Sequence, residues 1–158
     1  IYIHSSLIQP IPGIKNKTFN TSEELFVAIS SEMKNTVSVF MTAAVSDFIV
    51  NKADGKISRH NGKLNIELTP NKDIIASIKS EYPDVEYIAF SAQVNDDLNF
   101  DKIKSKNVDY LVINNILNND FGSDVNKIAI INHEELIYKS DTLSKNEIAQ
   151  AILINLDY

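Results

Sequence analysis

Apolar runs and amphipathic segments alternate along the chain, and the two patterns predict different elements. The apolar runs at residues 37–44, 87–92 and 110–114 are typical of buried strands. The segments at residues 21–35 and 144–156 instead repeat apolar side chains every three or four positions, as helices packed against a sheet do. Alternating strands and helices predict an α/β fold with a parallel sheet, in which ligands gather beyond the carboxyl ends of the strands.

Weaker patterns predict the strands near the two ends of the chain. Residues 1–5 and 14–19 are rich in β-forming side chains, and the lysines of the second segment are typical of a sheet edge. Residues 127–132 and 136–138 predict a last pair of strands. By contrast, residues 37–44 are apolar at nearly every position, so we expect them to form a central strand covered on both faces.

Polar residues mark where the helices begin. Residues 21–24 and 144–147 have the pattern of a capping box, in which a hydroxyl and a carboxylate satisfy backbone N–H groups at a helix start. Asn71 and Asp73 can cap another helix whose isoleucines face the core. A further helix is predicted around Ile103, so each strong strand has a helical neighbour in sequence.

The segment at residues 56–68 departs from the α/β pattern. Its polar and apolar residues alternate on both sides of Asn61 and Gly62, and Asn-Gly is a strong signal for a two-residue hairpin turn. We therefore expect a protruding antiparallel hairpin that serves as a flap or as a dimer arm.

Composition narrows the class of protein. The chain of 158 residues is 44% hydrophobic, which suits one domain spanning residues 1–158. The absence of cysteine excludes a structural disulfide, a thiolate nucleophile and a zinc-thiolate cluster. A net charge of -6 disfavours nucleic acid as a partner. Since the sequence has neither a long apolar run nor a signal-peptide pattern, we expect a cytoplasmic protein without a membrane partner.

Glycine and histidine provide no ready-made ligand site. The glycines form neither a dinucleotide-binding fingerprint nor a phosphate-binding loop, which argues against a dinucleotide oxidoreductase. His4, His60 and His133 lie far apart, and the spacing rules favour surface or hairpin positions over a histidine metal site. We accordingly expect no metal ligands from protein side chains.

Charged residues after the first strong strand are the best candidates for chemistry. Asp47 follows small residues at a strand end, where it either contacts ligand hydroxyls or Mg²⁺ or simply forms a turn. Lys56, nine residues further on, either swings over a polyphosphate or remains solvated. Lys102 and Lys106 are one helical turn apart, so they either share an anion or form a solvated face.

Several short motifs occur in a distinctive order. They are AAVSD at 43–47, GKIS at 55–58, NKDI at 71–74, AFSAQ at 89–93, the Lys102-x-x-x-Lys106-x-x-Asp109 spacing, VINN at 112–115 and FGSDVN at 121–126. In this order the chain resembles the phosphopantothenoylcysteine synthetase family, the ligase half of a bifunctional coenzyme A biosynthesis flavoprotein. The resemblance implies a Rossmann-like α/β fold with a protruding dimer arm.

The resemblance also implies a reaction and its participants. The family joins 4'-phosphopantothenate to L-cysteine through an acyl-cytidylate made from CTP, with release of pyrophosphate and then CMP. Mg²⁺ would accompany the triphosphate, no flavin would bind this domain, and a homodimer is implied. A flavin-dependent decarboxylase fused upstream is a further possibility, and ATP stays open as an alternative to CTP.

Site residues carry over from the resemblance position by position. Lys56 matches the mobile lysine that acts on the phosphates, and Asn114 matches a substrate-binding position. The positions that match nucleotide contacts are Ala43, Ala44, Asp47, Asn71, Lys72, Asp73, Ile74, Phe90, Lys102 and Lys106.

The sequence departs from the family pattern at several positions. Lys72 replaces a proline, Gln93 a glutamate and Asn115 an aspartate, and residues 58–59 replace two basic residues. The family's GGT-x-E and N-x-S-S-G segments do not occur, so we expect its first strand and helix to lie upstream of these residues, which alone would not complete the reaction. A nucleotide-binding module without ligase activity is the alternative.

Overall fold

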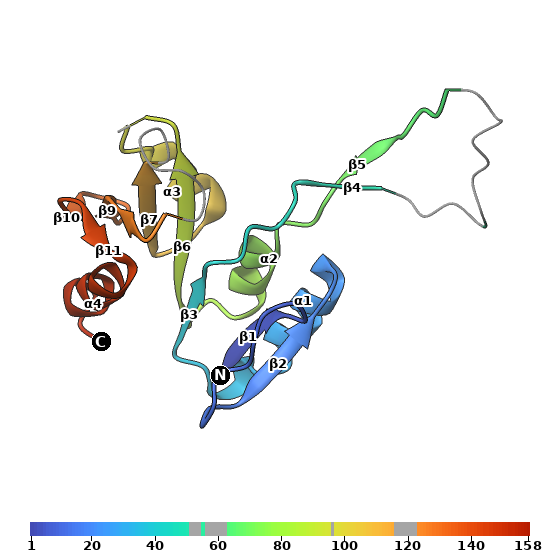
Figure 1. Cartoon of the computed structure of the whole chain (residues 1–158), viewed down its shortest axis with the longest axis horizontal. Coiled ribbons are helices and arrows are strands. Elements are labelled where there is room, and N and C mark those ends of the chain that lie inside the picture. Colours follow the sequence, from blue (N-terminus) through green and yellow to red (C-terminus); the bar gives the residue numbers. More distant parts are fainter. Residues whose placement is uncertain (51–54, 56–62, 96, 116–122) are drawn as a thin grey trace.

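The centre of the molecule is a mixed five-stranded sheet (Figure 1). The computed structural model describes residues 1–50, 55, 63–95, 97–115 and 123–158. In sheet order the strands are β10 (Leu136–Lys139), β9 (Ile128–Ile131), β7 (Tyr110–Asn115), β6 (Glu86–Gln93) and β3 (Ser38–Met41). Strands β3, β6 and β7 are parallel, and only β9 runs against the other four. The predicted α/β fold with a mostly parallel sheet is therefore confirmed.

Three smaller strand pairs accompany this sheet. Strands β1 (Tyr2–Ser5) and β2 (Asn16–Phe19) form a separate parallel pair. Short strands β8 (Val125–Asn126) and β11 (Leu143–Ser144) pair antiparallel beside the last helix. The third pair, β4 (Phe48–Val50) with β5 (Leu68–Pro70), is antiparallel and extends away from the body of the molecule (Figure 1).

The third pair corrects the bounds of the predicted hairpin. Its paired strands begin at Phe48 and end at Pro70, outside the expected segment 56–68. The Asn61-Gly62 turn lies outside the described residues. Hereafter residues 48–50 and 63–70 are called the arm.

Helices cover both faces of the sheet. They are α1 (Ser22–Ser30), the short 3-10 helix η1 (Met33–Asn35), α2 (Ile74–Glu81), α3 (Phe100–Lys106) and α4 (Lys145–Asn155). In the part of the chain that the structure describes, no helix has both the length and the apolar character needed to cross a membrane.

Two of the three predicted helix caps form as expected. The Asp73 carboxylate accepts a hydrogen bond from the N–H of Ala76, and residues 144–147 form a reciprocal capping box. At α1 the Thr21 hydroxyl accepts from the N–H of Glu24, as predicted. The Glu24 carboxylate, however, accepts from the N–H of Asn20 rather than from that of Thr21, so the expected reciprocal box is wrong there.

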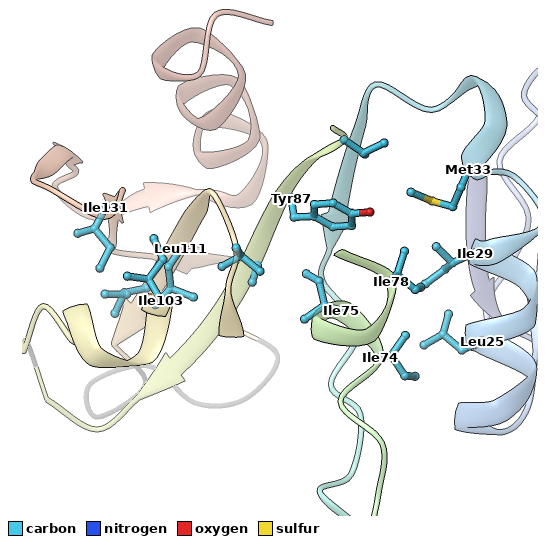
Figure 2. Packing of buried hydrophobic residues seen from close by; sticks show 14 of the residues in the cluster. Leu25, Ile29, Met33, Ile74, Ile75, Ile78, Tyr87, Ile103, Leu111 and Ile131 are labelled. Carbon is cyan, nitrogen blue, oxygen red and sulfur yellow. The ribbon is translucent and has the colours of Figure 1, made fainter. Parts of the chain in front are cut away.

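Two apolar clusters form the core, one on each face of the sheet. On one face, side chains of α1 and α2 meet over β6, and Figure 2 shows Leu25 and Ile29 facing Ile78 with Tyr87 beside them. On the other face, α4 packs against alternate residues of β6, β7 and β9. Tyr87 and Ile88 are neighbours in sequence, yet each is fully buried in a different cluster. Double burial of β6 and β7 explains their continuous apolar runs.

Two expectations about exposure are wrong. Residues 37–44 were expected in a central strand, but β3 forms the end of the five-stranded sheet, and Val37 is 83% exposed. Among the described strands, β3 therefore has a neighbour on one side only. Burial between two strands does not explain its apolar sequence. His4, expected at the surface, is 5% exposed because β1 is covered by β2 and α1. His133 is exposed as expected.

Candidate functional site

A small polar cavity of about 110 Å³ lies where the chain leaves β3. Four segments line it: the exit of β3, the start of α2, the middle of β6 and the end of α3. The lining residues are Met41, Ala43, Val45, Ser46, Asp47, Asn71, Lys72, Asp73, Ile74, Ile75, Ala89, Phe90 and Lys106. They include all the positions expected to contact a nucleotide except Ala44 and Lys102. Segments more than sixty residues apart in sequence thus meet at the carboxyl end of a parallel strand.

Asn71 fixes the two loops that form one wall of this cavity. Its backbone N–H donates to the carbonyl of Asp47 at 2.8 Å, and its side-chain amide donates to the carbonyl of Ser46 at 2.8 Å. Its side-chain oxygen accepts from the N–H of Lys72 at 2.9 Å and from the Ser22 hydroxyl at 3.4 Å. These bonds use both the NH₂ group and the oxygen of the Asn71 side chain. Asn71 therefore acts mainly by positioning its neighbours.

Asp73 has two roles at the start of α2. One carboxylate oxygen caps the helix by accepting from the N–H of Ala76 at 3.1 Å. The other lies 3.4 Å from the ammonium group of Lys106, which reaches across from α3. Asp73, Ile74 and Ile75 at the start of α2 line the cavity, and the dipole at a helix start favours negative charge.

The lining carries two cations in different settings. Lys106 is half-buried and paired with Asp73. The ammonium group of Lys72 lies 3.4 Å from the centre of the Phe26 ring on α1, a cation–π contact. Lys72 is exposed, so its side chain can leave the ring for an anion without burying charge elsewhere. Two lysines and a helix N-terminus give the cavity the groups that a phosphate chain requires.

An apolar wall faces these charges. Ile74 and Ala89 are each 3% exposed, whereas Phe90, the next residue of β6, packs its side chain on the opposite face of the sheet against the cluster that includes α4. Chemically, the cavity has an apolar side formed by Ile74 and Ala89 and a side with two lysines that favours anions.

Lys102 and Lys106 do not share a partner, although they lie one turn apart on α3. The Lys102 ammonium donates to the Ser91 hydroxyl at 2.7 Å, whereas Lys106 pairs with Asp73. Ser91 is 3% exposed, so Lys102 is held inward beside β6. Like-charge repulsion is relieved by this divergence, and the two lysines reach different parts of the strand-end region.

Asp109, part of the lysine motif, has a structural role. Its carboxylate accepts from the Lys79 ammonium at 2.8 and 3.0 Å and from the N–H of Tyr87 at 2.8 Å. Burial raises the pKa of Tyr87 to about 12, with a smaller contribution from the charge of Asp109. This cluster joins α2, β6 and the start of β7.

The remaining expected residues lie elsewhere. Lys56 is outside the described residues. Asn114 lies on β7 between Ala92 of β6 and Ile128 of β9, and it is not among the described residues that line the cavity. Among the residues that the structure describes, no group of three histidine, aspartate or glutamate side chains could hold a metal ion.

Sequence reasoning missed five lining residues. They are Met41, Val45, Ser46, Ile75 and Ala89. Four of them lie directly beside an expected residue, and Met41 lies two positions before Ala43. The backbone carbonyl of Ser46 accepts a hydrogen bond from the Asn71 side chain. The signal that could have identified them is position: they follow a strand, begin a helix or alternate with Phe90 along β6.

The family described as "DNA/pantothenate metabolism flavoprotein C-terminal domain" matches residues 3–157. A protein of Thermococcus kodakarensis named "Coenzyme A biosynthesis bifunctional protein CoaBC" is 34% identical over 142 residues, which are 84% of this chain and 34% of that protein. A protein of an unknown prokaryotic organism named "Cysteine/Cysteine sulfinic acid decarboxylase" is 32% identical over 119 residues, 72% of this chain and 33% of that protein.

A solved structure agrees with the fold. The C-terminal domain of a coenzyme A biosynthesis bifunctional protein CoaBC superimposes with a TM-score of 0.74 at 20% identity, over 98% of this chain and 73% of that chain. At this identity the likeness concerns the fold alone. The chain spans about a third of the length of the curated relatives that it matches.

Proposed function

Because the chain belongs to the family of DNA/pantothenate metabolism flavoprotein C-terminal domains, we propose that it acts in coenzyme A biosynthesis as an acid–amine ligase. In this proposal it joins 4'-phosphopantothenate to L-cysteine at the expense of CTP. The observation that carries the proposal is the cavity at the end of β3, where an apolar wall and two lysines surround the N-terminus of α2. The name of the Thermococcus relative supports the same pathway.

The cavity suits the first half of such a reaction. A carboxylate attacks a phosphoryl group poorly because both partners are anionic, so cations and fixed donors must bring them together. Ile74 and Ala89 would contact the base, while Lys106 and the start of α2 would hold phosphate oxygens. The acyl-cytidylate would form with loss of pyrophosphate, and the cysteine amine would then displace CMP.

Lys72 and Asp47 complete the proposed nucleotide site. Lys72 would move from the Phe26 ring toward the phosphates, because a phosphate offers it a full charge in place of a ring face. Asp47 is the lining carboxylate that neither caps a helix nor pairs with Lys106, which suits it to ribose hydroxyls or to a hydrated cation. Lys56 and Lys102 remain proposed phosphate contacts, and Asn114 remains a proposed acyl-substrate contact.

Mg²⁺ fits this arrangement as a partner of the triphosphate. The described residues provide no metal cage of their own, and Mg²⁺ readily keeps most of its ligands as water and phosphate oxygens. When bound, the ion would neutralise charge on the phosphates. Asp47 is the lining side chain best suited to contact its water shell.

The proposal is tested by following pyrophosphate release by the full-length source protein. Release should require CTP, phosphopantothenate and Mg²⁺, and formation of the amide should also require L-cysteine. Lys106→Ala should lower the rate at least tenfold, since it removes a charge-assisted contact to phosphate. Lys104→Ala is the matched control, because Lys104 lies on the exposed side of the same helix. Lack of pyrophosphate release by the wild-type protein would contradict ligase activity.

A second candidate function is nucleotide binding without turnover. The sequence differs from the ligase family at Gln93 and Asn115, which lie side by side at the ends of β6 and β7. This alternative predicts saturable CTP binding that no acyl substrate converts into product. Calorimetric titration with CTP and then ATP would measure binding and nucleotide preference separately from the rate assay.

We also propose that the arm mediates a homodimer. Its described apolar side chains are exposed on β4, on β5 and in the segment that leads into β5: Phe48, Ile49, Val50, Leu64, Ile66 and Leu68 are each between 42% and 59% exposed. A protruding ribbon with this composition is expected to be covered by a partner. Ile49→Lys should shift the mass measured by light scattering from dimer to monomer. Thr69→Lys, at a half-buried position of the paired strand, is the control that tests whether any added charge in the arm is enough to separate the dimer.

A further inference from the structure

A separate cavity, of about 180 Å³, lies beside β7, β9 and β10. It is lined by the loop after β6, the end of β7, the start of β9 and the end of β10. Among the described residues, none lines both this cavity and the site cavity at the end of β3. We call it the β9 cavity. The proposed ligase reaction assigns no role to it.

The floor of the β9 cavity is apolar and buried. Ile113 of β7 and Ala129 of β9 are 4% and 8% exposed, and they are paired across the two antiparallel strands. Leu98, in the loop before α3, lines the cavity and packs against the same apolar cluster. A ligand with a small apolar group would therefore remove further apolar surface from water at this floor.

Three charged side chains line the same cavity. Lys139 of β10 is paired with Ala129 of β9. The same register, continued by two residues, places Lys127 opposite Asp141. Residues that are opposite or diagonal on one face of an antiparallel pair have Cβ atoms about 5 to 8 Å apart. The two lysines and the aspartate therefore lie around one opening.

Ser140 fixes the end of β10 that carries two of these charges. Its N–H donates to the carbonyl of Ile128 at 2.9 Å, and its hydroxyl accepts from the N–H of Ile128 at 2.9 Å. Ser140 is 7% exposed, so both hydrogen bonds are shielded from water. The backbone between Lys139 and Asp141 is therefore held against β9, and the two side chains start from fixed positions.

The three charges have no ion-pair partners of their own. In the part of the chain that the structure describes, no ion pair includes Lys127, Lys139 or Asp141, and all three residues are exposed. In a chain with a net charge of -6, two neighbouring lysines without a partner favour an anionic group. Asp141 beside them favours a cationic group on the same ligand.

We propose that the β9 cavity binds a small α-amino acid. The carboxylate would lie between Lys127 and Lys139, the ammonium group would face Asp141, and the side chain would contact Ile113 and Ala129. An inorganic anion would leave Asp141 facing like charge, so the zwitterion suits the cavity better. The size agrees, because a cavity of about 150 Å³ holds benzene and the smaller amino acids are of similar size.

This inference goes beyond the proposed ligase activity and does not depend on it. Binding is measured by calorimetry with the full-length source protein in the absence of any nucleotide. The probe is L-valine, whose apolar side chain suits the floor. Isovalerate lacks the ammonium group and L-valinamide lacks the carboxylate, so they are the matched analogues. Each analogue should bind at least tenfold more weakly than L-valine.

Variants of the charged residues distinguish an amino acid from a simple anion. Lys127→Ala and Lys139→Ala should each weaken L-valine binding at least fivefold, since each removes a charge-assisted contact to the carboxylate. Asp141→Asn should weaken L-valine binding but strengthen the binding of inorganic phosphate, because it removes a negative charge. Lys145→Ala is the control and should change neither, because Lys145 is exposed on α4 and does not line the cavity.

Three results would overturn the proposal. The first is failure of L-valine to bind, or equal binding of L-valine and isovalerate. The second is L-valine binding that Lys127→Ala and Lys139→Ala leave unchanged, because the amino acid would then lie elsewhere. The third is stronger phosphate binding by Asp141→Asn without any loss of L-valine binding, because the cavity would then select for negative charge alone.

Discussion

The two cavities beside β3 differ in how their polar backbone groups are satisfied. At the site cavity, Asn71 and Asp73 bind the loop after β3 and the first N–H groups of α2 with short local hydrogen bonds. At the cavity of about 530 Å³ between residues 1–3 and 36–43, the facing strands β1 and β3 are not hydrogen-bonded to each other. The first region is held together by a few side chains, whereas the second is an open gap among the described strands. A site can therefore be well formed locally beside a gap between strands.

Truncation of the core should separate the two regions most strongly. Ile78 is a residue of α2 and is 1% exposed. Ile78→Ala should lower the free energy of unfolding by about 4 kcal/mol, because it removes buried apolar surface and leaves an enclosed cavity. Ile29→Ala should cost only about 2 kcal/mol, because Ile29 already borders the cavity between β1 and β3 and its removal enlarges an existing space. Urea denaturation measures both values. Val27 is exposed, so Val27→Ala is the control and should change the free energy of unfolding by about zero. Equal losses of stability for Ile78→Ala and Ile29→Ala would contradict the expected difference between the two positions.

Alkaline pH should weaken the core that supports the site wall. The pKa of Tyr87 is raised to about 12, so the folded state holds the phenol proton more tightly than the unfolded state does. The resulting stability is complete below about pH 10 and is lost as the pH rises through 12, up to about 2–3 kcal/mol. Urea denaturation between pH 8 and 12 measures the slope.

Tyr87→Phe is the matched control for this pH dependence. It removes the hydrogen bond from the Tyr87 hydroxyl to the carbonyl of Tyr82, at 3.1 Å, and should cost about 1 kcal/mol at neutral pH. Between pH 10 and 12 its stability should fall less than that of the wild type. Parallel curves for the two proteins would show that the other tyrosines account for the alkaline loss.

The cap at the start of α2 should have a smaller effect. Asp73→Ala removes the acceptor for the N–H of Ala76 and should cost about 1 kcal/mol of stability. Asp73→Ser keeps an acceptor at the cap but not the charge opposite Lys106. If capping is the main role, serine should restore most of the stability in urea denaturation; if the ion pair is, serine should behave like alanine.

The cation–π contact should give the smallest effect. A double-mutant cycle of Phe26→Leu and Lys72→Met should give a coupling free energy of about 0.5 kcal/mol, since the lysine is exposed. The proposed movement of Lys72 adds a second readout, because Phe26→Leu should leave CTP affinity unchanged or slightly higher while Lys72→Met should lower it. Equal weakening by both would mean that the ring itself contacts the nucleotide.

Much of the fold could be predicted from local patterns. Burial on both faces makes β6 and β7 continuous apolar runs, and Asp73 and residues 144–147 have the side chains that helix caps require. These signals depend on neighbours within a few positions. The motifs at 43–47 and 71–74 likewise identified residues that meet in one cavity, since each follows a strand or begins a helix.

Signals that depend on distant partners were missed or misread. The apolar sequence of β3 predicts a central strand, but among the described residues β3 forms the end of the five-stranded sheet. Lys102 and Lys106 are one helical turn apart, a spacing that suits a shared ligand. Their partners are instead Ser91 and Asp73. Asp109 lies in a functional motif and serves the fold. In each case a contact far away in sequence decides the role.

The hydrogen bond from the N–H of Asn71 to the carbonyl of Asp47 has a consequence for how the arm can vary. The bond brings together the two ends of the segment 48–70, so this segment leaves and re-enters the body at a single closed point. Its length is thereby decoupled from the geometry of the site, as it is for a domain inserted between two adjacent chain ends. The length and sequence of the arm can therefore change without moving a residue of the cavity beside it.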